Sequence, residues 1–304
     1  MQKSSKIYVA GHRGMVGTAL TKRLAADGYT NIITRTHSQL DLTRQADVEN
    51  FFATEKPEYV FLLAAQQGGI AYNRDFPADA LIINSLIELN VIKAAHENAA
   101  KRLIFTSSST VYPEVAPQPM SEDLFLTGAL EKSLGGFALA KSLGMRICEY
   151  LGKQYGTKFT SIIVPNLYGE NDKGTTVLPM LIQKFKNAVA TNAETVEVWG
   201  TGNARRELLH AADVADAMLF INENFTEPTH INAGYGTDIS IRELAELLKK
   251  ISGFNGEIFF DTTKPEGTMQ KLLDSTKLFG LGWRPTQTIE QGIASVYHSY
   301  QLKS

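Results

Sequence analysis

Short apolar runs alternate with longer amphipathic segments through the first half of the chain. The runs at 7–10, 32–34, 59–63, 103–106 and 161–164 are rich in isoleucine, leucine, valine and aromatic residues. Runs of this length and composition favour β-strands. Because a longer segment separates each run from the next, we expect parallel strands joined by crossover helices.

The intervening segments have the apolar spacing of helices. At 17–27, 78–99 and 136–155, apolar side chains recur every three or four residues, and polar side chains occupy the opposite side. Helices of this kind should cover both faces of the sheet. The predicted fold class is therefore α/β, with a Rossmann-type doubly wound parallel sheet.

The alternation loosens after Pro165, where a smaller domain is expected to begin. Residues 171–176 have the composition of a loop and precede a helical pattern at 177–186. Residues 207–222 have the pattern of a turn and a helix that return to the large domain. A helix at 239–251, a strand near 258–260 and a final helix after residue 285 are expected to complete the smaller domain.

These segments predict two domains, of which the smaller is discontinuous. The Rossmann domain is expected over residues 1–168 and about 205–225, and the substrate-binding domain over about 169–204 and 226–304. Ligands of open α/β sheets bind outside the carboxyl ends of the strands. A second domain placed there would close a cleft.

Composition and charge exclude several functions. The chain has 304 residues, of which 43% are hydrophobic, and its formal charge of -2 gives no basic field for nucleic acid or an anionic membrane. The longest apolar run, 59–65, is too short to cross a membrane, and no apolar signal-peptide region precedes the first strand. The single cysteine, Cys148, cannot form an internal disulfide and is expected to be inert core. We expect a cytoplasmic protein without nucleic-acid or membrane partners.

A glycine-rich turn follows the first strand. Gly11, Gly14 and Gly17 have the spacing G-x-x-G-x-x-G, and a helical pattern begins after them. Glycines at such a place serve either as a packing turn or as a loop that lets backbone N–H groups approach a pyrophosphate. The strand–turn–helix context favours the dinucleotide interpretation.

Arg35 follows the second strand, where an NAD-specific protein usually has an acid that binds the ribose hydroxyls. A guanidinium at this point favours a 2′-phosphate, and therefore NADPH as the cofactor. Arg13, within the glycine turn, is a second candidate for phosphate binding. The alternative for each arginine is a solvated loop residue.

A cluster of hydroxyl residues, 106–110, ends the fourth strand at the edge of the sheet where ligands bind. A Ser/Thr-rich turn would have the same composition. A long helix follows, in which Phe137 and Lys141 lie on one face because they are four residues apart. Together these features favour a substrate site.

Seven motifs of the chain resemble those of the extended short-chain dehydrogenases/reductases, and among them the GDP-L-fucose synthases. They are GHRGMVGTAL, AAQQGGI, SSSTVYP, ALAKSLGMRICE, PNLYGEND, WGTGNARRELLHAADVA and KLLDSTKLFGLGW, and they extend over nearly the whole chain. The resemblance implies NADPH/NADP+ as the cofactor, a GDP-linked 4-keto sugar as the substrate, and a homodimer built through helix packing. It also implies that Ser108 and Lys141 belong to a Ser-Tyr-Lys catalytic set.

The resemblance further implies two sets of binding residues and no metal site. The cofactor would contact Gly11, Arg13, Gly14, Met15, Val16, Gly17, Arg35, Asp41, Leu42, Ala64, Ala65, Lys141, Pro165 and Leu167. The substrate would contact Ser108, Asn166, Lys184, Trp199, Arg206 and Lys271. A solvated surface position is the alternative for each basic residue, and a core position is the alternative for Trp199. His210, at a helix start, is expected to be structural.

Three departures from the family pattern change the expected chemistry. Phe137 stands where the family has the catalytic tyrosine, and Thr110 and Thr176 stand where it has a cysteine and a histidine. That Cys/His pair works as base and acid in the epimerisation at C3 and C5, and threonine hydroxyls are poorly suited to either role. The sequence therefore predicts a C4-reductase without epimerase activity, which acts on a GDP-4-keto-(6-deoxy) hexose or heptose in the synthesis of cell-surface polysaccharide precursors.

Other functions remain open at this point. The missing tyrosine hydroxyl indicates weak turnover, either in an engineered variant or in a natural form of low activity. A degenerate protein that binds NADPH or a nucleotide-sugar without turnover is one alternative, and an epimerase/reductase of the GDP-L-fucose synthase type is another. UDP or dTDP could replace GDP as the nucleotide.

Overall fold

The computed structural model describes residues 1–172, 174, 176–264 and 267–300. Its largest element is a six-stranded sheet in the order β2-β1-β3-β4-β5-β10, in which every neighbouring pair is parallel. The strands are β1 (Ile7–Ala10), β2 (Ile32–Ile33), β3 (Tyr59–Leu62), β4 (Arg102–Ser108), β5 (Phe159–Val164) and β10 (His230–Asn232). The predicted doubly wound α/β fold is confirmed.

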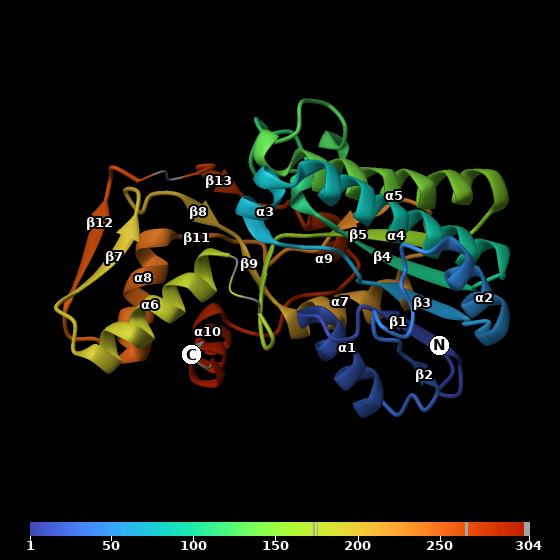
Figure 1. The fold of residues 1–304 in the computed structure, drawn as a ribbon, viewed down its shortest axis with the longest axis horizontal. Helices are drawn as coiled ribbons and strands as arrows, with labels where there is room; N and C mark the ends of the chain where they lie inside the picture. Colours follow the sequence, from blue (N-terminus) through green and yellow to red (C-terminus); the bar gives the residue numbers. More distant parts are fainter. Residues whose placement is uncertain (173, 175, 265–266, 301–304) are drawn as a thin grey trace.

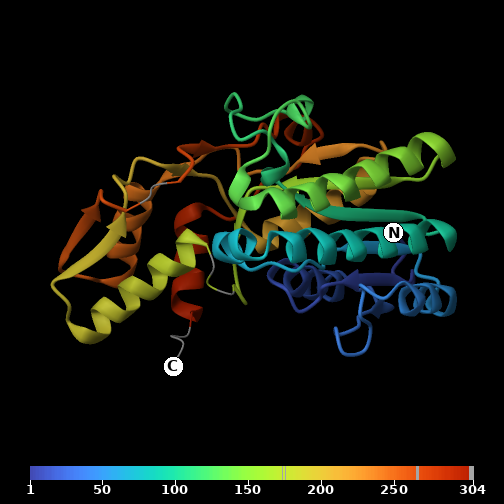
Figure 2. The ribbon, with the colours of Figure 1, turned by 45° about the horizontal axis from the view of Figure 1, so that its top comes forward.

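Helices cover both faces of this sheet because its residues alternate between two cores (Figure 1). Tyr8 packs into one core and its neighbours Ile7 and Val9 into the other, as the two-residue period of a strand requires. The helices on the Tyr8 face are α2 (Gln45–Glu55), α4 (Pro77–Glu97) and α5 (Gly135–Tyr155), and those on the opposite face are α1 (Met15–Ala26) and α7 (Ala211–Asn224). Figure 2 shows α4 and α5 running side by side along the sheet.

Short elements connect these helices to the sheet. The helix α3 (Gly69–Asp75) precedes α4, and three 3-10 turns, η1 (Ser109–Val111), η2 (Glu122–Leu124) and η3 (Lys132–Leu134), lie between β4 and α5. No helix in the described part of the chain is long and apolar enough to span a lipid bilayer.

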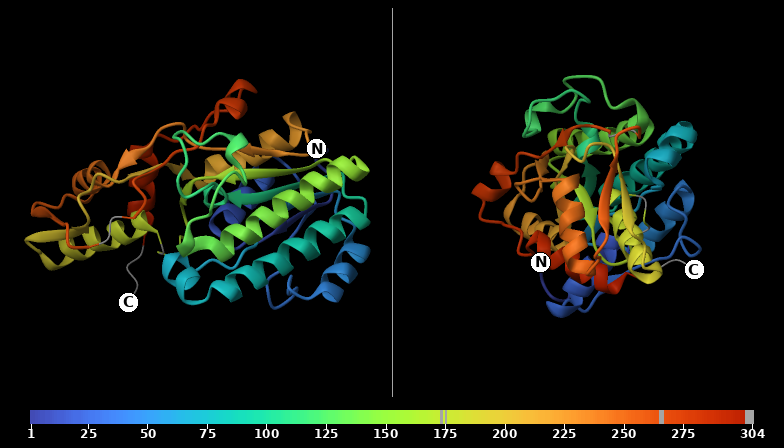
Figure 3. Two further views of the ribbon diagram at one scale, coloured as in Figure 1. Left: turned by 90° about the horizontal axis from the view of Figure 1, so that it is seen from above. Right: turned by 90° about the vertical axis from the view of Figure 1, so that its left-hand side faces the viewer.

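A second, smaller body lies beyond the carboxyl ends of the large sheet (Figure 3). Its core joins Leu181 and Phe185 of α6 (Val177–Thr191) to Leu244 and Leu248 of α8 (Ile241–Ser252). The other elements are β7 (Thr195–Trp199), β12 (Glu257–Asp261), β8 (Arg205–Arg206), β11 (Ile239–Ser240), β13 (Gln270–Lys271) and α10 (Ile289–Ser299).

The chain returns to the large sheet more often than the sequence predicts. The sequence predicts that all of 226–304 belongs to the smaller domain, but β10 is the sixth strand of the large sheet, and α9 (Thr276–Gly280) packs beside it. The indole of Trp283 packs into the α1/α7 core and donates to Asp216 at 2.9 Å. A three-residue strand, His-Ile-Asn, is too short for its periodicity to be recognised in the sequence.

The two bodies meet along a short parallel ladder. The strand β6 (Asn166–Tyr168) pairs with β9 (Leu208–His210), so the chain leaving the large sheet lies beside the chain that returns to α7. A loop between β4 and α5 adds a second connection, because Met120 exchanges backbone hydrogen bonds with residues 272–274. These connections hold the smaller body over the carboxyl edge of the sheet.

Candidate active site

The glycine turn lies at the point where the chain order of the sheet reverses. Gly11 follows β1 with φ +95°, and a Cβ placed on it would be 2.7 Å from the backbone nitrogen of Ala64, which follows β3. A Cβ on Gly17 would be 2.1 Å from the carbonyl oxygen of Gly11. The turn therefore admits only glycine at these two positions, and it brings backbone N–H groups close to the start of α1.

This turn fits the pyrophosphate of a dinucleotide. The first turn of α1, which includes the predicted contacts Met15 and Val16, has no acidic residue, so the positive end of the helix dipole is not neutralised. Arg13 is exposed on the turn. Where β3 ends, Asn84 of α4 accepts from the backbone N–H of Gln66 at 2.8 Å and fixes the strand end that includes Ala64 and Ala65.

Arg35 lies at the end of β2 and is paired with α2. Its Nη2 is 2.6 Å from Oε1 of Glu55, and its Nη1 donates to the carbonyl of Thr34. The side chain is 34% exposed, so a phosphate approaching from solvent would compete with Glu55 for the guanidinium. Binding of the 2′-phosphate by Arg35 stays a prediction.

The two residues predicted beyond Arg35 form a fixed loop. Asp41 accepts hydrogen bonds from the backbone N–H and the hydroxyl of Thr43, and these bonds hold the pKa of its carboxyl below the usual value. Leu42 is buried, and its carbonyl accepts a hydrogen bond from Asn90 of α4 at 2.9 Å. The backbone of this loop is therefore presented in one conformation.

Ser108 is the last residue of β4 and stands at the carboxyl edge of the sheet. Its hydroxyl accepts a hydrogen bond from the backbone N–H of Thr110 at 3.4 Å and caps η1. The hydroxyls of Ser107 and Thr110 are buried and have no hydrogen-bond partner among the described residues. The predicted hydroxyl cluster is thus partly solvent-shielded, and Ser108 is the member at the strand terminus.

Phe137 and Lys141 lie on the buried face of α5, 5% and 4% exposed. The Nζ of Lys141 is 4.7 Å from the ring centroid of Phe105 on β4 and 5.5 Å from that of Phe137. It also forms an ion pair with Glu88 of α4, with 3.0 Å between Nζ and Oε1. Because α5 packs against η1, Lys141 lies in the same part of the molecule as Ser108.

Sequence reasoning missed Glu88. It is fully buried, and its pKa is raised to about 7 by burial, with the nearby Lys141 acting in the opposite direction. The available signal was its place on the helix: it lies four residues after Asn84 and three before Val91, both of them buried. A glutamate on the apolar stripe of a helix requires a partner.

Two predicted substrate residues meet in the smaller body. Strands β8 and β13 are paired so that Lys271 stands beside Arg206. The Nη1 of Arg206 donates to the carbonyl of Thr268 at 2.6 Å, and Lys271 forms an ion pair with Glu131 of the large body. Lys271 thus lies at a contact between the two bodies, with Arg206 beside it.

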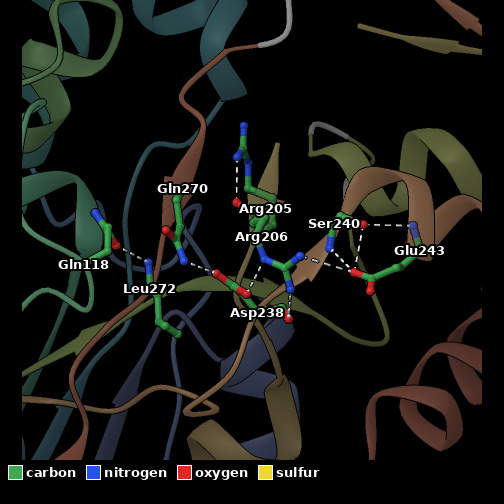
Figure 4. A network of polar contacts seen from close by, with 8 residues as sticks. All are labelled: Gln118, Arg205, Arg206, Asp238, Ser240, Glu243, Gln270 and Leu272. Carbon is green, nitrogen blue, oxygen red and sulfur yellow. Dashed lines mark hydrogen bonds and ion pairs between the residues drawn. The ribbon is translucent and has the colours of Figure 1, made fainter. Parts of the chain in front are cut away.

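The adjacent Arg205 has a different environment. Its Nε is 2.6 Å from Oδ1 of Asp238, and its Nη1 is 3.5 Å from Oε2 of Glu243. Figure 4 shows the side chain of Arg206 directed away from this network. Arg205 therefore ties β8 to β11 and α8, and Arg206 is the arginine oriented elsewhere.

The remaining predicted substrate residues are more dispersed. Lys184 of α6 donates to the carbonyl of Glu197 at 2.7 Å, and its Nζ is 5.7 Å from the ring centroid of Trp199, which is 51% exposed. Thr176 is the N-cap residue of α6 without a side-chain capping bond. Asn166 belongs to β6, flanked by the predicted cofactor contacts Pro165 and Leu167.

His210 has the structural role expected of it. Its Nδ1 accepts a hydrogen bond from the backbone N–H of Ala212 and caps α7, and burial lowers the pKa of its imidazole. Cys148 is buried, and burial raises its pKa to about 12, so its thiol is not a nucleophile. The described residues contain no group of three or more His, Cys, Asp or Glu side chains that could hold a metal ion.

A family model and several known proteins match the chain. The model described as NAD dependent epimerase/dehydratase family matches residues 7–234. Putative GDP-L-fucose synthase 2 of Arabidopsis thaliana is 46% identical over 304 residues, which are 99% of this chain and 93% of that protein.

Two solved structures from Campylobacter jejuni are similar over the full fold. A GDP-6-OMe-4-keto-L-xylo-heptose reductase superimposes with a TM-score of 0.91 at 37% identity, covering 99% of this chain and 98% of that one. A GDP-mannoheptose C4 reductase with NADP bound superimposes with a TM-score of 0.90 at 40% identity, covering 98% of both chains.

Proposed function

The chain belongs to the NAD dependent epimerase/dehydratase family, and from that membership we propose that it reduces the C4 ketone of a GDP-linked 4-keto sugar with NADPH. The observation that carries the proposal is the placement of Ser108 and Lys141, the two retained members of the family's catalytic set. Ser108 ends β4 at the edge of the sheet where ligands bind, and the Nζ of Lys141 lies over the ring of Phe105, three residues earlier on the same strand.

The chain's own residues have distinct tasks in this reaction. NADPH, when bound, supplies the hydride. The hydroxyl of Ser108 donates a hydrogen bond to the ketone oxygen and stabilises the negative charge that develops there. Lys141 holds the hydroxyls of the nicotinamide ribose. The ring of Phe137 has no proton to give to the new alkoxide, so Ser108 or water supplies it, and turnover is slow.

Reduction proceeds without epimerisation in this proposal. The hydroxyl of Thr110 is buried and without a hydrogen-bond partner among the described residues, and Thr176 occupies the N-cap of α6. An alcohol with no base beside it does not remove a proton from a sugar carbon at a useful rate. An epimerase/reductase would require another acid–base pair in the site.

The nucleotide-sugar is held between the two bodies. Arg206 and Lys271 stand side by side where the diphosphate would lie, and Lys184 and Trp199 offer a cation and an aromatic ring on α6 and β7. The sugar is a hexose or a heptose of the kind used in cell-surface polysaccharide precursors; the similar heptose reductases support the heptose.

A second copy of the chain covers the outer face of α4 and α5. Exposed apolar side chains recur along both helices: Ile82, Leu86 and Leu89 on α4, and Leu139, Leu143 and Tyr150 on α5. The two helices are neighbours, so a second copy related by a two-fold axis would bury these side chains together. The proposed assembly is therefore a homodimer.

A second candidate function follows from Phe137 alone. Loss of the tyrosine hydroxyl favours a protein that binds NADPH and a nucleotide-sugar without turnover. The protein is incubated with NADPH and a GDP-4-keto-6-deoxy sugar in deuterium oxide, and the products are identified by mass spectrometry. Reduction at C4 without deuterium at C3 or C5 is expected. Deuterium at those carbons contradicts the reductase-only proposal, and tight binding without any reduced product favours the second candidate.

Parallel titrations with GDP, UDP and dTDP test the nucleotide. GDP is expected to bind most tightly. Equal or tighter binding of UDP or dTDP would show that the guanine part of the proposal is wrong.

A further inference from the structure

The core between α4 and α5 contains a carboxylate that the proposed reaction does not use. Glu88 has no exposed surface, and its Oε1 is 3.0 Å from the Nζ of Lys141. The side chain of Lys141 is only 5% exposed. Both charges have therefore lost nearly all contact with water, which costs free energy unless each charge compensates the other.

The other neighbours of the ammonium group are aromatic rings. The rings of Phe105 and Phe137 are 4.7 and 5.5 Å from Nζ and attract a cation only weakly compared with a carboxylate. Among the elements packed against α5, β5 and η1 have no ionisable side chain, and Arg102 of β4 lies at the opposite end of that strand. Glu88 is thus the counter-charge of Lys141 in the described structure.

The position of the carboxylate is fixed by a close approach of the two helices. A Cβ placed on Gly144 would be 2.7 Å from Oε2 of Glu88 and 2.6 Å from the ring of Phe105. The missing side chain at 144 creates the space that the carboxylate fills. The backbone N–H of Gly144 also favours the charged form of Glu88.

An ammonium group has three N–H donors. With Oε1 of Glu88 at 3.0 Å from Nζ, the ion pair keeps the group at this place on α5, although neither carboxylate oxygen accepts a hydrogen bond from the described residues. This matters because Lys141 is not held by any other ion pair among the described residues.

We propose that Glu88 is a positioning residue: it keeps the Lys141 ammonium charged and in place so that its N–H groups bind the ribose hydroxyls of the cofactor. The inference rests on the proposed function in so far as Lys141 binds the ribose of NADPH. It assigns to α4 a task in cofactor binding that the glycine turn and Arg35 do not perform.

The test is the pH dependence of NADPH binding, measured by the change in NADPH fluorescence. In Glu88→Gln the buried ammonium has lost its counter-charge and releases its proton at a lower pH. We expect wild-type affinity to be nearly constant between about pH 8 and about pH 9.5, above the range in which Glu88 itself titrates, and that of E88Q to fall about tenfold over the same range. A purely structural defect would weaken binding equally at every pH.

Other ionisable groups near Lys141 do not produce this pattern. Burial raises the pKa of the Cys148 thiol to about 12, and the nearby charge of Glu88 acts in the same direction. The thiol therefore stays neutral over the pH range of the titration. The charges of α3 and η3, at Arg74, Asp75 and Lys132, are exposed and unchanged in the variant. Glu97→Gln makes the same chemical change at an exposed position of α4 and serves as the matched control, with a wild-type profile expected.

The outcomes separate this inference from the cofactor assignment. If neither the wild type nor E97Q binds NADPH, the proposed cofactor is wrong. If both bind and E88Q has the wild-type profile, the role of Glu88 is wrong. If E88Q does not fold, as judged by circular dichroism, the titration is made with Glu88→Asp, which keeps the charge but withdraws the carboxylate from Nζ. Weakened binding in E88D supports the inference, and unchanged binding overturns it.

Discussion

We predict that the identity of one side chain, Phe137, limits the rate of the proposed reaction. Its ring is 5% exposed and lies 5.5 Å from the Lys141 ammonium, so a hydroxyl added to the ring has a cation nearby to increase its acidity. We expect Phe137→Tyr to increase the rate of NADPH oxidation with a GDP-4-keto sugar by a hundredfold or more, because general-acid assistance contributes about 10²–10⁴ in rate.

The matched control for this variant is Phe76→Tyr, the same change at an exposed position. It should leave the rate unchanged. Should F137Y bind both ligands and gain nothing, the protein is a binding protein and the reductase proposal fails.

A second residue-scale expectation concerns Arg35 and the choice of cofactor. Arg35→Ala should weaken the binding of NADPH by about 1.5–3 kcal/mol, as expected for a hydrogen bond to a charged group, and leave the binding of NADH unchanged. Glu55→Gln should strengthen the binding of NADPH, because it removes the carboxylate charge that pairs with the Arg35 guanidinium in the wild type. Titrations with both cofactors measure these effects, with the exposed Arg44→Ala as control. If R35A loses equal binding affinity for NADPH and NADH, Arg35 does not bind the 2′-phosphate.

The residues differ in how far the sequence reveals them. The glycine spacing predicted the turn because the required φ and the contact with Ala64 are local constraints that only glycine satisfies. Glu88 was not predicted because its partner is on another helix, and no local pattern specifies which buried charges meet. Arg205 and Arg206 are adjacent and identical in type, and only the positions of Asp238 and Glu243 distinguish them.

At the scale of elements, Glu207 joins strands of the smaller body to the large sheet. It lies between β8 and β9 and accepts hydrogen bonds from the backbone N–H groups of Leu273 and Gly236, each at 2.9 Å. Burial raises its pKa to about 7 from an ordinary 4.5. The folded protein therefore holds this proton more tightly than the unfolded chain does, and the stability that it provides is lost as the pH rises from about 4.5 to about 7.

The expectation is a pH-dependent difference between the wild type and Glu207→Gln. Between about pH 4.5 and about pH 7 the free energy of unfolding of the wild type should fall by about 3 kcal/mol relative to that of the variant. Above about pH 7 the difference between the two proteins should be constant. Denaturant unfolding at a series of pH values measures it, with the exposed Glu246→Gln as control. Parallel curves for the wild type and E207Q would show that Glu207 does not titrate in this range.

The pair of helices α4 and α5 has two different faces. Its inner face contains Glu88 and Lys141, and its outer face exposes apolar side chains. We expect Leu143→Arg to convert the proposed dimer into a monomer, because a charge on that face would be buried unpaired. Light scattering after size exclusion measures the mass, and Val115→Arg, on an exposed loop, is the control. A wild-type monomer would show that the face has no second copy on it.

For the whole molecule, the sequence predicted the architecture better than the division between its parts. Strands such as β1 and β3 were predicted because their residues are apolar on both faces, as in a sheet covered on both sides. The strand β10 was not predicted from the sequence, because its pairing with β5 rather than its own composition places it in the sheet. Arg206 and Lys271 were expected to bind one ligand, and the pairing of β8 with β13 places the two residues side by side.

The repeated crossing of the chain between the two bodies also determines when each can form during synthesis on the ribosome. A nascent chain that has emerged as far as β10 has every strand of the large sheet, but Leu278 and Trp283, which fill the core beneath α7, have not yet appeared. The smaller body is completed later in synthesis, because Gly292 of α10 packs directly against the ring of Tyr168 and Val296 belongs to its core. The large body is unfinished until Trp283 has left the exit tunnel and the smaller one until Val296 has, so folding chaperones would encounter both bodies incomplete.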